Sequence, residues 1–275
     1  MNNNGKKRQN YNKSSEKQME GNRINTETCC NLGYIFYNSE STMENLVKSK
    51  TKERLEKILD FKIGNISVND IDYKLIFENN EYKSFSLKTT YPGLLIGIGN
   101  IPMLLPILSS STNGEIKTGF SFDYVTGLPY IPASTVKGII RSRIEKYYDT
   151  VSNWMKNKKL KFEDGPNSFL SELFGSSKGE ANINKRDVFF DAVIRAEGKK
   201  IFEEDYITPH KDMYSGVNPI KILKIKEGIE FEFRFLIRDF EICGLSQDHR
   251  FELYKAILKE LGVGAKTNVG YGFLE

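Results

Sequence analysis

The most regular pattern of apolar and polar positions lies between Ser134 and Tyr148. Apolar residues recur there with helical spacing, and the polar residues between them fall on the opposite side of a helix. The apolar face carries Val136, Ile140, Ile144 and Tyr147, and the polar face carries Ser134, Lys137, Arg141 and Glu145. The spacing therefore predicts an amphipathic helix with a basic outer face. Similar spacing predicts helices over residues 41–61 and 247–261.

The other apolar runs are short and favour strands. They lie within residues 72–90, 188–195, 220–225 and 229–237, and the last two flank Glu227-Gly228 as in a β-hairpin. Residues 93–108 are apolar but are interrupted by Pro and Gly, and they are shorter than the about 20 residues that a membrane span needs. We interpret them as a buried strand leading into a loop. The last few residues of the chain are expected to form a closing strand.

Two segments interrupt this order of helices and strands. Residues 149–186 are typical of an insertion with one short helix near Ser168–Phe174, and residues 196–219 of a polar excursion. Without them, the order is strand, helix, strand, strand, helix, strand. This is the ferredoxin-like arrangement, which the RNA-recognition module shares. We therefore expect an α+β fold with a ferredoxin-like (RRM-like) core, insertions and a disordered N-terminal tail.

The N-terminal segment differs in composition from the rest of the chain. Residues 1–28 are poor in apolar side chains and hold six Lys/Arg and three Glu, so they carry +3 of the formal net charge of +4. We expect this tail to be disordered. No segment typical of an interdomain linker follows residue 40, so residues 29–275 are predicted to form a single domain with insertions. Because this body is nearly neutral, it would need a local basic patch to bind a polyanion.

Cysteine and histidine are too scarce to support several classes of protein. Three Cys and two His exclude a disulfide framework and leave little for a metal site. Cys29, Cys30 and Cys243 lack zinc-site spacing. The N-terminus is rich in Asn and has no apolar stretch of a secretory signal. We expect a cytoplasmic protein with reduced thiols and no membrane contact.

The first candidate binding site is the start of the helix near Ser134. Pro132 precedes Ser134 and Thr135, residue types that cap the exposed N–H groups of a helix. Such N–H groups attract phosphate. Lys137 and Arg141 are four residues apart and project from the same face. The alternative is an ordinary capped amphipathic helix with a solvated basic side.

The second candidate is the glycine-rich segment Gly262–Gly272. Four glycines would let the backbone approach a ligand closely, and Lys266 adds a cation. The candidate contact residues in it are Gly262, Gly264, Lys266, Thr267, Asn268 and Tyr271. It is not a P-loop, because Ala265 stands where that motif needs Gly and the segment follows a predicted helix. The alternative is a helix C-cap and a tight turn into an edge strand.

The third candidate lies in residues 206–214. His210 and Lys211 stand between two Tyr, so they are candidates to stack on bases or to donate to phosphate. His210 and Asp212 are alternatively the start of an acid/base pair, although a lone loop histidine is usually neither. The chain contains no nucleophile motif of the Gly-x-Ser-x-Gly kind, and we expect no cofactor.

Together, these segments resemble the RAMP superfamily of CRISPR effector subunits. The resemblance rests on TGLPYIPASTVKGIIRSRIE at 126–145, VFFDAV at 188–193, ITPH at 207–210 with PIKIL at 219–223, and GVGAKTNVGYG at 262–272. It covers residues 90–275 and is greatest toward the sixth-subunit family of type III-B (Cmr) complexes. The chain departs from the usual pattern at Ala133, where the family has Gly.

The resemblance implies a ferredoxin-like core that holds a guide RNA (crRNA) near its 3′ end in antiviral defence. It implies neighbouring Cmr subunits as partners, both backbone RAMP proteins and small helical subunits, with target RNA as a further candidate. We therefore expect a non-catalytic RNA-binding subunit with phosphate contacts from Lys137, Arg141 and Lys266, since such contacts do not depend on RNA sequence.

Two other function classes stay open on the sequence. One is an endoribonuclease that cleaves guide precursor or target RNA, for which Asp123 precedes the basic helix, although FSFDYVTG does not align with the cleaving pattern. The other is a stand-alone RNA-binding module. The aromatic and Ile-rich stretch 91–130 argues against the second, because a large exposed apolar patch requires a partner.

Overall fold

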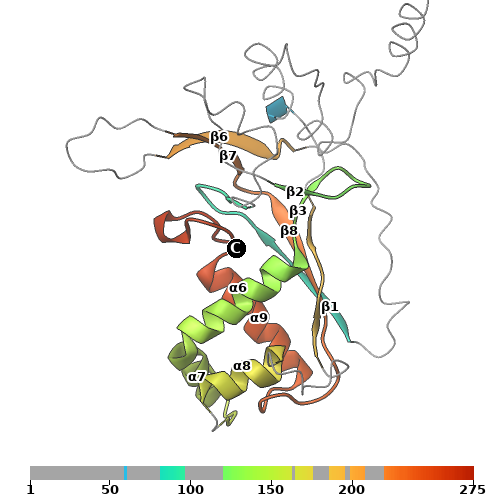
Figure 1. The fold of residues 1–275 in the computed structure, drawn as a ribbon, viewed down its shortest axis with the longest axis vertical. Coiled ribbons are helices and arrows are strands. Elements are labelled where there is room, and N and C mark those ends of the chain that lie inside the picture. Colours follow the sequence, from blue (N-terminus) through green and yellow to red (C-terminus); the bar gives the residue numbers. More distant parts are fainter. Residues whose placement is uncertain are drawn as a thin grey trace, which may run out of the picture.

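The part of the chain that the structure describes combines an antiparallel sheet, helices on one of its faces and a separate two-stranded sheet (Figure 1). The computed structural model describes residues 59–60, 81–96, 120–162, 165–175, 186–195, 199–207 and 220–275. A mixed α and β fold is therefore confirmed. Within these residues, no helix is both long enough and apolar enough to cross a bilayer.

The main sheet has the strand order β1-β8-β5-β3-β2, with β4 also paired to β8, and all its pairs are antiparallel. Its strands are β1 (Tyr82–Lys88), β2 (Ser121–Phe122), β3 (Pro129–Ile131), β4 (Val188–Phe189), β5 (Ala192–Ile194) and β8 (Glu230–Leu236). β6 (Phe202–Ile207) and β7 (Ile220–Ile225) form the second sheet. The helices are α6 (Ala133–Lys146), α7 (Tyr148–Asn157), α8 (Pro166–Phe174) and α9 (Gln247–Leu261), with a 3₁₀ turn η3 (Thr267–Val269).

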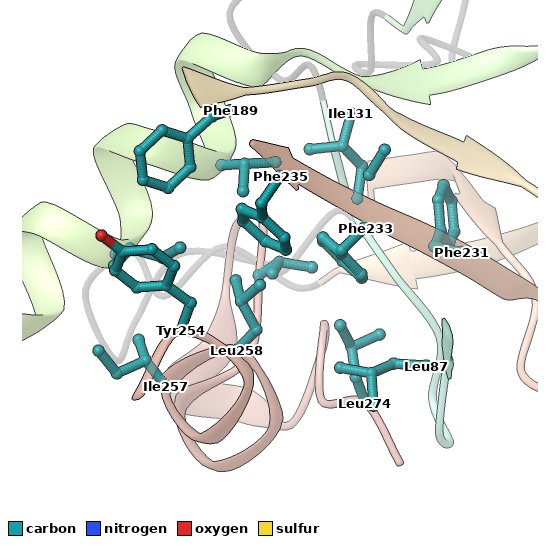
Figure 2. Packing of buried hydrophobic residues seen from close by; sticks show 14 of the residues in the cluster. Leu87, Ile131, Phe189, Phe231, Phe233, Phe235, Tyr254, Ile257, Leu258 and Leu274 are labelled. Atoms are coloured by element: carbon teal, nitrogen blue, oxygen red, sulfur yellow. The ribbon is translucent and has the colours of Figure 1, made fainter. Parts of the chain in front are cut away.

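The core lies between the main sheet and helices α6 and α9. Side chains alternate along a strand, so Phe231, Phe233 and Phe235 of β8 all point inward and are fully buried. Figure 2 shows them packed toward α9, where Tyr254 and Leu258 are buried in the same cluster. Burial of each such side chain contributes roughly 1.5–3 kcal/mol, so this cluster fixes α9 on the sheet.

The predicted hairpin of residues 220–225 and 229–237 is wrong. β7 pairs with β6, whereas β8 pairs with β1, β4 and β5. The turn at Gly228 passes the chain from the small sheet to the main sheet, because Gly228 N–H donates to Thr89 O and the Ile225 N–H donates to Leu94 O. The segment after β1 therefore forms hydrogen bonds with residues that the sequence predicted to belong to a single hairpin.

The segment expected to be a polar excursion contains strand β6. Its sequence, FEEDYI, has too many acidic residues for an apolar alternation, which is why the pattern missed it. The acidic side chains are accommodated because Glu203 and Asp205 form ion pairs with Lys224 of β7. Residues 188–195 likewise form two short strands, β4 and β5, in place of one.

The expected insertion 149–186 contains two helices, not one. α8 agrees with the predicted short helix, and α7 follows α6 after Tyr147 with Val151 and Met155 buried. The expected closing strand is reduced to a single bridge between Leu274 and Thr89 at the end of β1. The predicted tail 1–28, nearly all of the predicted helix 41–61, and residues 97–119 and 208–219 lie outside the described residues.

Candidate nucleic-acid interface

Helix α6 presents the polar face that the sequence predicts. Val136, Ile140 and Ile144 are buried in the core, as expected. Ser134, Thr135 and Arg141 are exposed, and Lys137 is half-buried. Gly138 lies on the same outer face, and a Cβ built on it would meet no atom within 4 Å. The outer face of α6 is therefore polar and has open space at Gly138, so another chain can approach it closely there.

The first turn of α6 is capped differently from the expectation. Pro132 occupies the N-cap position, and no side chain of the cap residue accepts a hydrogen bond. The Ala133 N–H instead donates to Asp191 Oδ1 at 2.7 Å, and the Thr135 and Val136 N–H groups donate to Pro132 O. A carboxylate of the chain itself thus stands where we expected a phosphate, so the basic side chains have to supply the attraction.

One of those side chains, Lys137, lies beside the Phe189 ring, close enough to Arg141 and Arg186 to feel their charges. Lys137 Nζ lies 5.9 Å from the ring centroid of Phe189. Burial, and then the like charges of Arg186 and Arg141, lower the pKa of Lys137. Because every one of these influences disfavours the charge of Lys137, an anion beside the cluster Lys137–Arg141–Arg186 would stabilise the charged form of Lys137.

Arg186 is the member of this cluster that the sequence reading missed. It lies 45 residues after Arg141, just before β4, and no local pattern connects the two residues. Gly175, which ends α8 with φ +90°, makes room for its guanidinium group: a Cβ there would lie 2.2 Å from Arg186 Cζ. The fold of the insertion therefore supplies the third cation.

The glycine-rich C-terminal segment lies along the other edge of α6. Arg143 Nη2 donates to Thr267 Oγ1 at 3.1 Å. At about 100° per residue, Arg143 and Arg141 point about 160° apart around the helix axis. The two candidate sites are thus separated by the outer face of α6. A bound strand that touched both would have to cross that face near Gly138.

The glycines of this segment make room for the protein itself. A Cβ on Gly264 would lie 2.3 Å from Leu95 O, and a Cβ on Gly272 would lie 1.8 Å from Val263 O. Backbone hydrogen bonds fix the same contacts, from Ala265 N–H to Leu95 O and from Val263 N–H to Gly272 O. The close approach that we expected toward a ligand is therefore used within the chain, as in the alternative of a tight turn.

The outer part of the segment is a single exposed turn. Lys266, with a left-handed φ of 56°, directly precedes η3, and Gly270, with φ 97°, directly follows it. Lys266 and Asn268 are exposed, Thr267 is half-buried, and Val269 is 67% exposed. Gly262 and Gly264, by contrast, serve the internal contacts. Of the predicted contact residues here, Lys266, Thr267 and Asn268 remain accessible to a ligand.

Tyr271 is directed into the protein. It is only 8% exposed, and its hydroxyl donates to Asp205 Oδ2 at 2.7 Å. Burial and the Asp205 carboxylate raise the pKa of this hydroxyl, so it stays protonated. Asp205 Oδ2 also accepts from Lys224 Nζ at 2.9 Å. This contact joins the C-terminal segment to the β6–β7 sheet, and we exclude Tyr271 from the interface.

The remaining sequence candidates fall elsewhere. His210 and Lys211 lie outside the described residues. Asp123 is exposed in the turn between β2 and β3, where its Oδ1 accepts from the N–H groups of Val125 and Thr126 and from the Thr126 hydroxyl. Across the described ranges, no cluster of three or more His, Cys, Asp or Glu side chains is placed to hold a metal ion.

Known proteins resemble this chain in sequence. Residues 86–275 match the RAMP superfamily. The chain is 30% identical over 238 residues to the CRISPR system CMR subunit Cmr6 of Saccharolobus solfataricus, covering 83% of this chain and 75% of that protein. It is 35% identical over 122 residues to the CRISPR system Cmr subunit Cmr6 of Pyrococcus furiosus, covering 38% of this chain and 34% of that protein.

A solved structure has a similar fold. It is a chain in the cryo-EM structure of the type III-B Cmr-beta bound to cognate target RNA, with a TM-score of 0.54 and 24% sequence identity. The match covers 88% of this chain and 78% of that chain. At this identity the likeness concerns the arrangement of helices and strands.

Proposed function

The chain belongs to the RAMP superfamily, and from this premise we propose that it is a non-catalytic, RNA-binding subunit of a type III-B (Cmr) CRISPR effector complex. Its curated relatives are Cmr6 subunits, which supports the same place in the assembly. The proposal includes a ferredoxin-like core, guide RNA (crRNA) held near its 3′ end, and other Cmr subunits as neighbours.

The observation that carries the RNA-binding part is the cluster Lys137–Arg141–Arg186 on one edge of α6. Burial lowers the pKa of Lys137 most, and repulsion from Arg186 and Arg141 lowers it further. A bound phosphate would offset that repulsion. The opposite edge adds Lys266 on an exposed turn. Side-chain contacts to phosphate fix a strand in place without reading its bases, which suits a subunit that accepts any guide sequence.

The non-catalytic part of the proposal is supported by the state of Asp123. Its Oδ1 is occupied by three hydrogen bonds within its own turn, which is a structural role of the Asx-turn kind. An Asp123→Asn variant should therefore leave the fate of guide and target RNA unchanged. A complex that loses a target cut through Asp123→Asn, with guide RNA still bound, would instead support the endoribonuclease alternative.

The binding proposal is tested by removing the α6 charges. Lys137→Ala with Arg141→Ala should weaken binding to single-stranded RNA and reduce the slope of log affinity against log salt by about 1.4, since each lost phosphate contact removes about 0.7. Fluorescence anisotropy at a series of salt concentrations measures both quantities. Lys137→Gln with Arg141→Gln should have the same effect, and it keeps a side-chain stem at position 137, next to Phe189.

A matched control is available on α9. Lys255 and Lys259 are exposed and have the same spacing on their helix. Lys255→Ala with Lys259→Ala removes the same formal charge, so it should leave the salt slope near that of the unmodified chain. Equal slopes for the two double variants, with both proteins folded, would show that the α6 face contacts protein or solvent and not RNA.

A further inference from the structure

The turn after β1 presents an aromatic ring to solvent. Tyr91 is 80% exposed, next to Pro92. The turn itself is well fixed: Gly93 N–H donates to Thr90 O at 2.7 Å, and both the N–H and the hydroxyl of Thr90 donate to Phe273 O. An exposed ring on a fixed backbone can stack on a ligand without ordering a loop first.

This turn lies against the exposed part of the C-terminal segment. A Cβ on Gly270 would lie 3.5 Å from Pro92 Cδ, and Gly272 N–H donates to Gly93 O. Figure 1 shows the turn after β1 above the C-terminal segment, on the same side of the sheet. Tyr91 therefore stands beside the turn that carries Lys266, an exposed cation, and Val269, which is 67% exposed.

The charge of the turn beside Tyr91 favours nucleic acid. Residues 262–274 contain Lys266 and no Asp or Glu. The carboxylate of Asp205, which Tyr271 contacts, pairs with Lys224 at 2.9 Å, and Lys224 also pairs with Glu203 at 3.3 Å. Tyr124, which is 98% exposed, is a contrast because it directly follows Asp123. Its surroundings are acidic, since burial and the carboxylates of Asp191 and Asp123 raise the pKa of the nearby Tyr130. Among the residues that the structure describes, Tyr91 is the exposed ring that lies beside a turn with a cation and no acidic residue.

We propose that Tyr91 stacks on an unpaired base of the bound RNA while Lys266 contacts the adjacent phosphate. This inference rests on the proposed function, and it adds a base contact that the phosphate cluster on α6 does not provide. Base–aromatic stacking is tolerant of sequence, because every base has a π-face. Tyr91 therefore adds affinity without limiting which guide sequence is bound.

The test uses the full chain and a fluorescently labelled, single-stranded RNA of mixed sequence, about 20 nucleotides long to cover several bases. Tyr91→Ala should weaken binding by about 5- to 150-fold, as for the loss of one base stack. The salt slope should stay unchanged, since no phosphate contact is lost. Tyr91→Phe keeps the ring and should bind within about twofold of the unmodified chain.

Tyr124→Ala is the matched control, because it removes an exposed Tyr ring from an acidic turn, and its affinity should not change. Binding by Tyr91→Ala equal to that of the unmodified chain would overturn the stacking role alone, and loss of a co-purifying subunit from that variant would assign the ring to a protein contact. An unmodified chain that binds no RNA would overturn the proposed function and this inference together. An equal loss in Tyr91→Phe would also overturn stacking.

Discussion

At the scale of single residues, the glycines of the C-terminal segment are structural. Gly264 has φ +81°, and a Cβ there would lie 2.3 Å from Leu95 O and 2.9 Å from Leu94 Cδ1. Backbone oxygen cannot move away as a flexible side chain can. The role of Gly264 is therefore to let the C-terminal segment pack on residues 93–95.

The first prediction is that Gly264→Val destabilises the fold by about 2–4 kcal/mol, from the strained φ and the clash together. RNA retention should fall with it, and by more than in Lys266→Ala, whose exposed side chain has only its charge to lose. Urea denaturation followed by circular dichroism measures the stability of both variants. A fully stable Gly264→Val protein that still retains RNA would contradict this assignment.

Gly138 provides the matched control for Gly264. It lies inside α6, and a Cβ there would meet no atom within 4 Å. Gly138→Ala should therefore raise stability by roughly 0.5–1 kcal/mol, as expected for a helix-interior glycine. The two substitutions together separate the effect of a Cβ clash from that of the substitution itself.

The second prediction concerns Asp205 and acid stability. Burial acts to raise the pKa of this carboxyl, but hydrogen bonds from Lys224, Tyr271 and the Tyr206 N–H outweigh it, so the pKa is lowered. The unfolded chain therefore binds the proton more readily than the folded one. The resulting stabilisation is present above the unfolded pKa of about 3.9 and is lost as the pH falls through the lowered value.

The urea midpoint of the unmodified chain should accordingly fall more steeply than that of Asp205→Asn as the pH is lowered below about 4. Tyr271→Phe removes one of the hydrogen bonds that lower this pKa, so its pH dependence should lie between the two. Identical profiles for all three proteins would show that the contact between Asp205 and Tyr271 does not contribute to folding.

At the scale of elements, Asp191 stabilises the start of α6 and, on the proposed function, weakens RNA binding there. The Asp191 carboxylate accepts from the Ala133 N–H and places a negative charge at the helix end. The third prediction is that Asp191→Ala destabilises the protein by about 0.5–2 kcal/mol, as loss of a cap does. The same change should tighten RNA binding, because it frees an N–H group and removes a like charge to phosphate.

Thermal unfolding and RNA titration measure these two effects of Asp191→Ala independently. Asp123→Ala serves as the control, because it removes an exposed carboxylate whose hydrogen bonds stay within its own turn. A folded Asp191→Ala protein whose RNA affinity is unchanged would show that no phosphate approaches the start of α6.

The elements that the sequence predicted correctly are those with a regular period of their own. α6 and α9 each bury an apolar stripe, so helical spacing was sufficient to predict both. The pairing of β7 could not be predicted in this way. The backbone of Leu94 bonds to Ile225 at the end of β7, and the backbone of Thr89 bonds to Gly228 in the turn that follows. Both residues lie more than 120 positions earlier in the chain, so no local pattern reveals these contacts.

The candidate site was predictable only where it lies on one helix. Lys137 and Arg141 share a face because of their spacing, and the structure agrees. Arg186 joins them only through the packing of α8 and β4, and no motif marks it. For the glycine-rich segment, the sequence favoured a site where the backbone contacts a ligand. In the structure, Leu95 O and Val263 O occupy the spaces that Gly264 and Gly272 leave.

At the scale of the whole molecule, the charge is divided unequally between the tail and the rest of the chain. Residues 1–28 carry +3 and residues 29–275 carry +1. A nearly neutral body would not hold RNA by its overall field, so the proposed RNA binding requires local cations, and Lys137, Arg141, Arg186 and Lys266 supply them within the described residues. The charges of the tail have no apolar anchor near them in the sequence, so we expect them to act only by diffuse attraction.

The last prediction separates these two contributions by their range. Deleting residues 1–28 should change RNA affinity by less than about twofold at physiological salt, where the Debye length is about 8 Å. At 0.01 M salt it is about 30 Å, so the intact chain should bind measurably more tightly than the truncated one. Lys137→Ala with Arg141→Ala should weaken binding at both salt concentrations, and its effect should add to that of the deletion. If the truncation alone abolishes binding or assembly at physiological salt, the tail makes direct contacts, and the α6 cluster is not the main source of affinity.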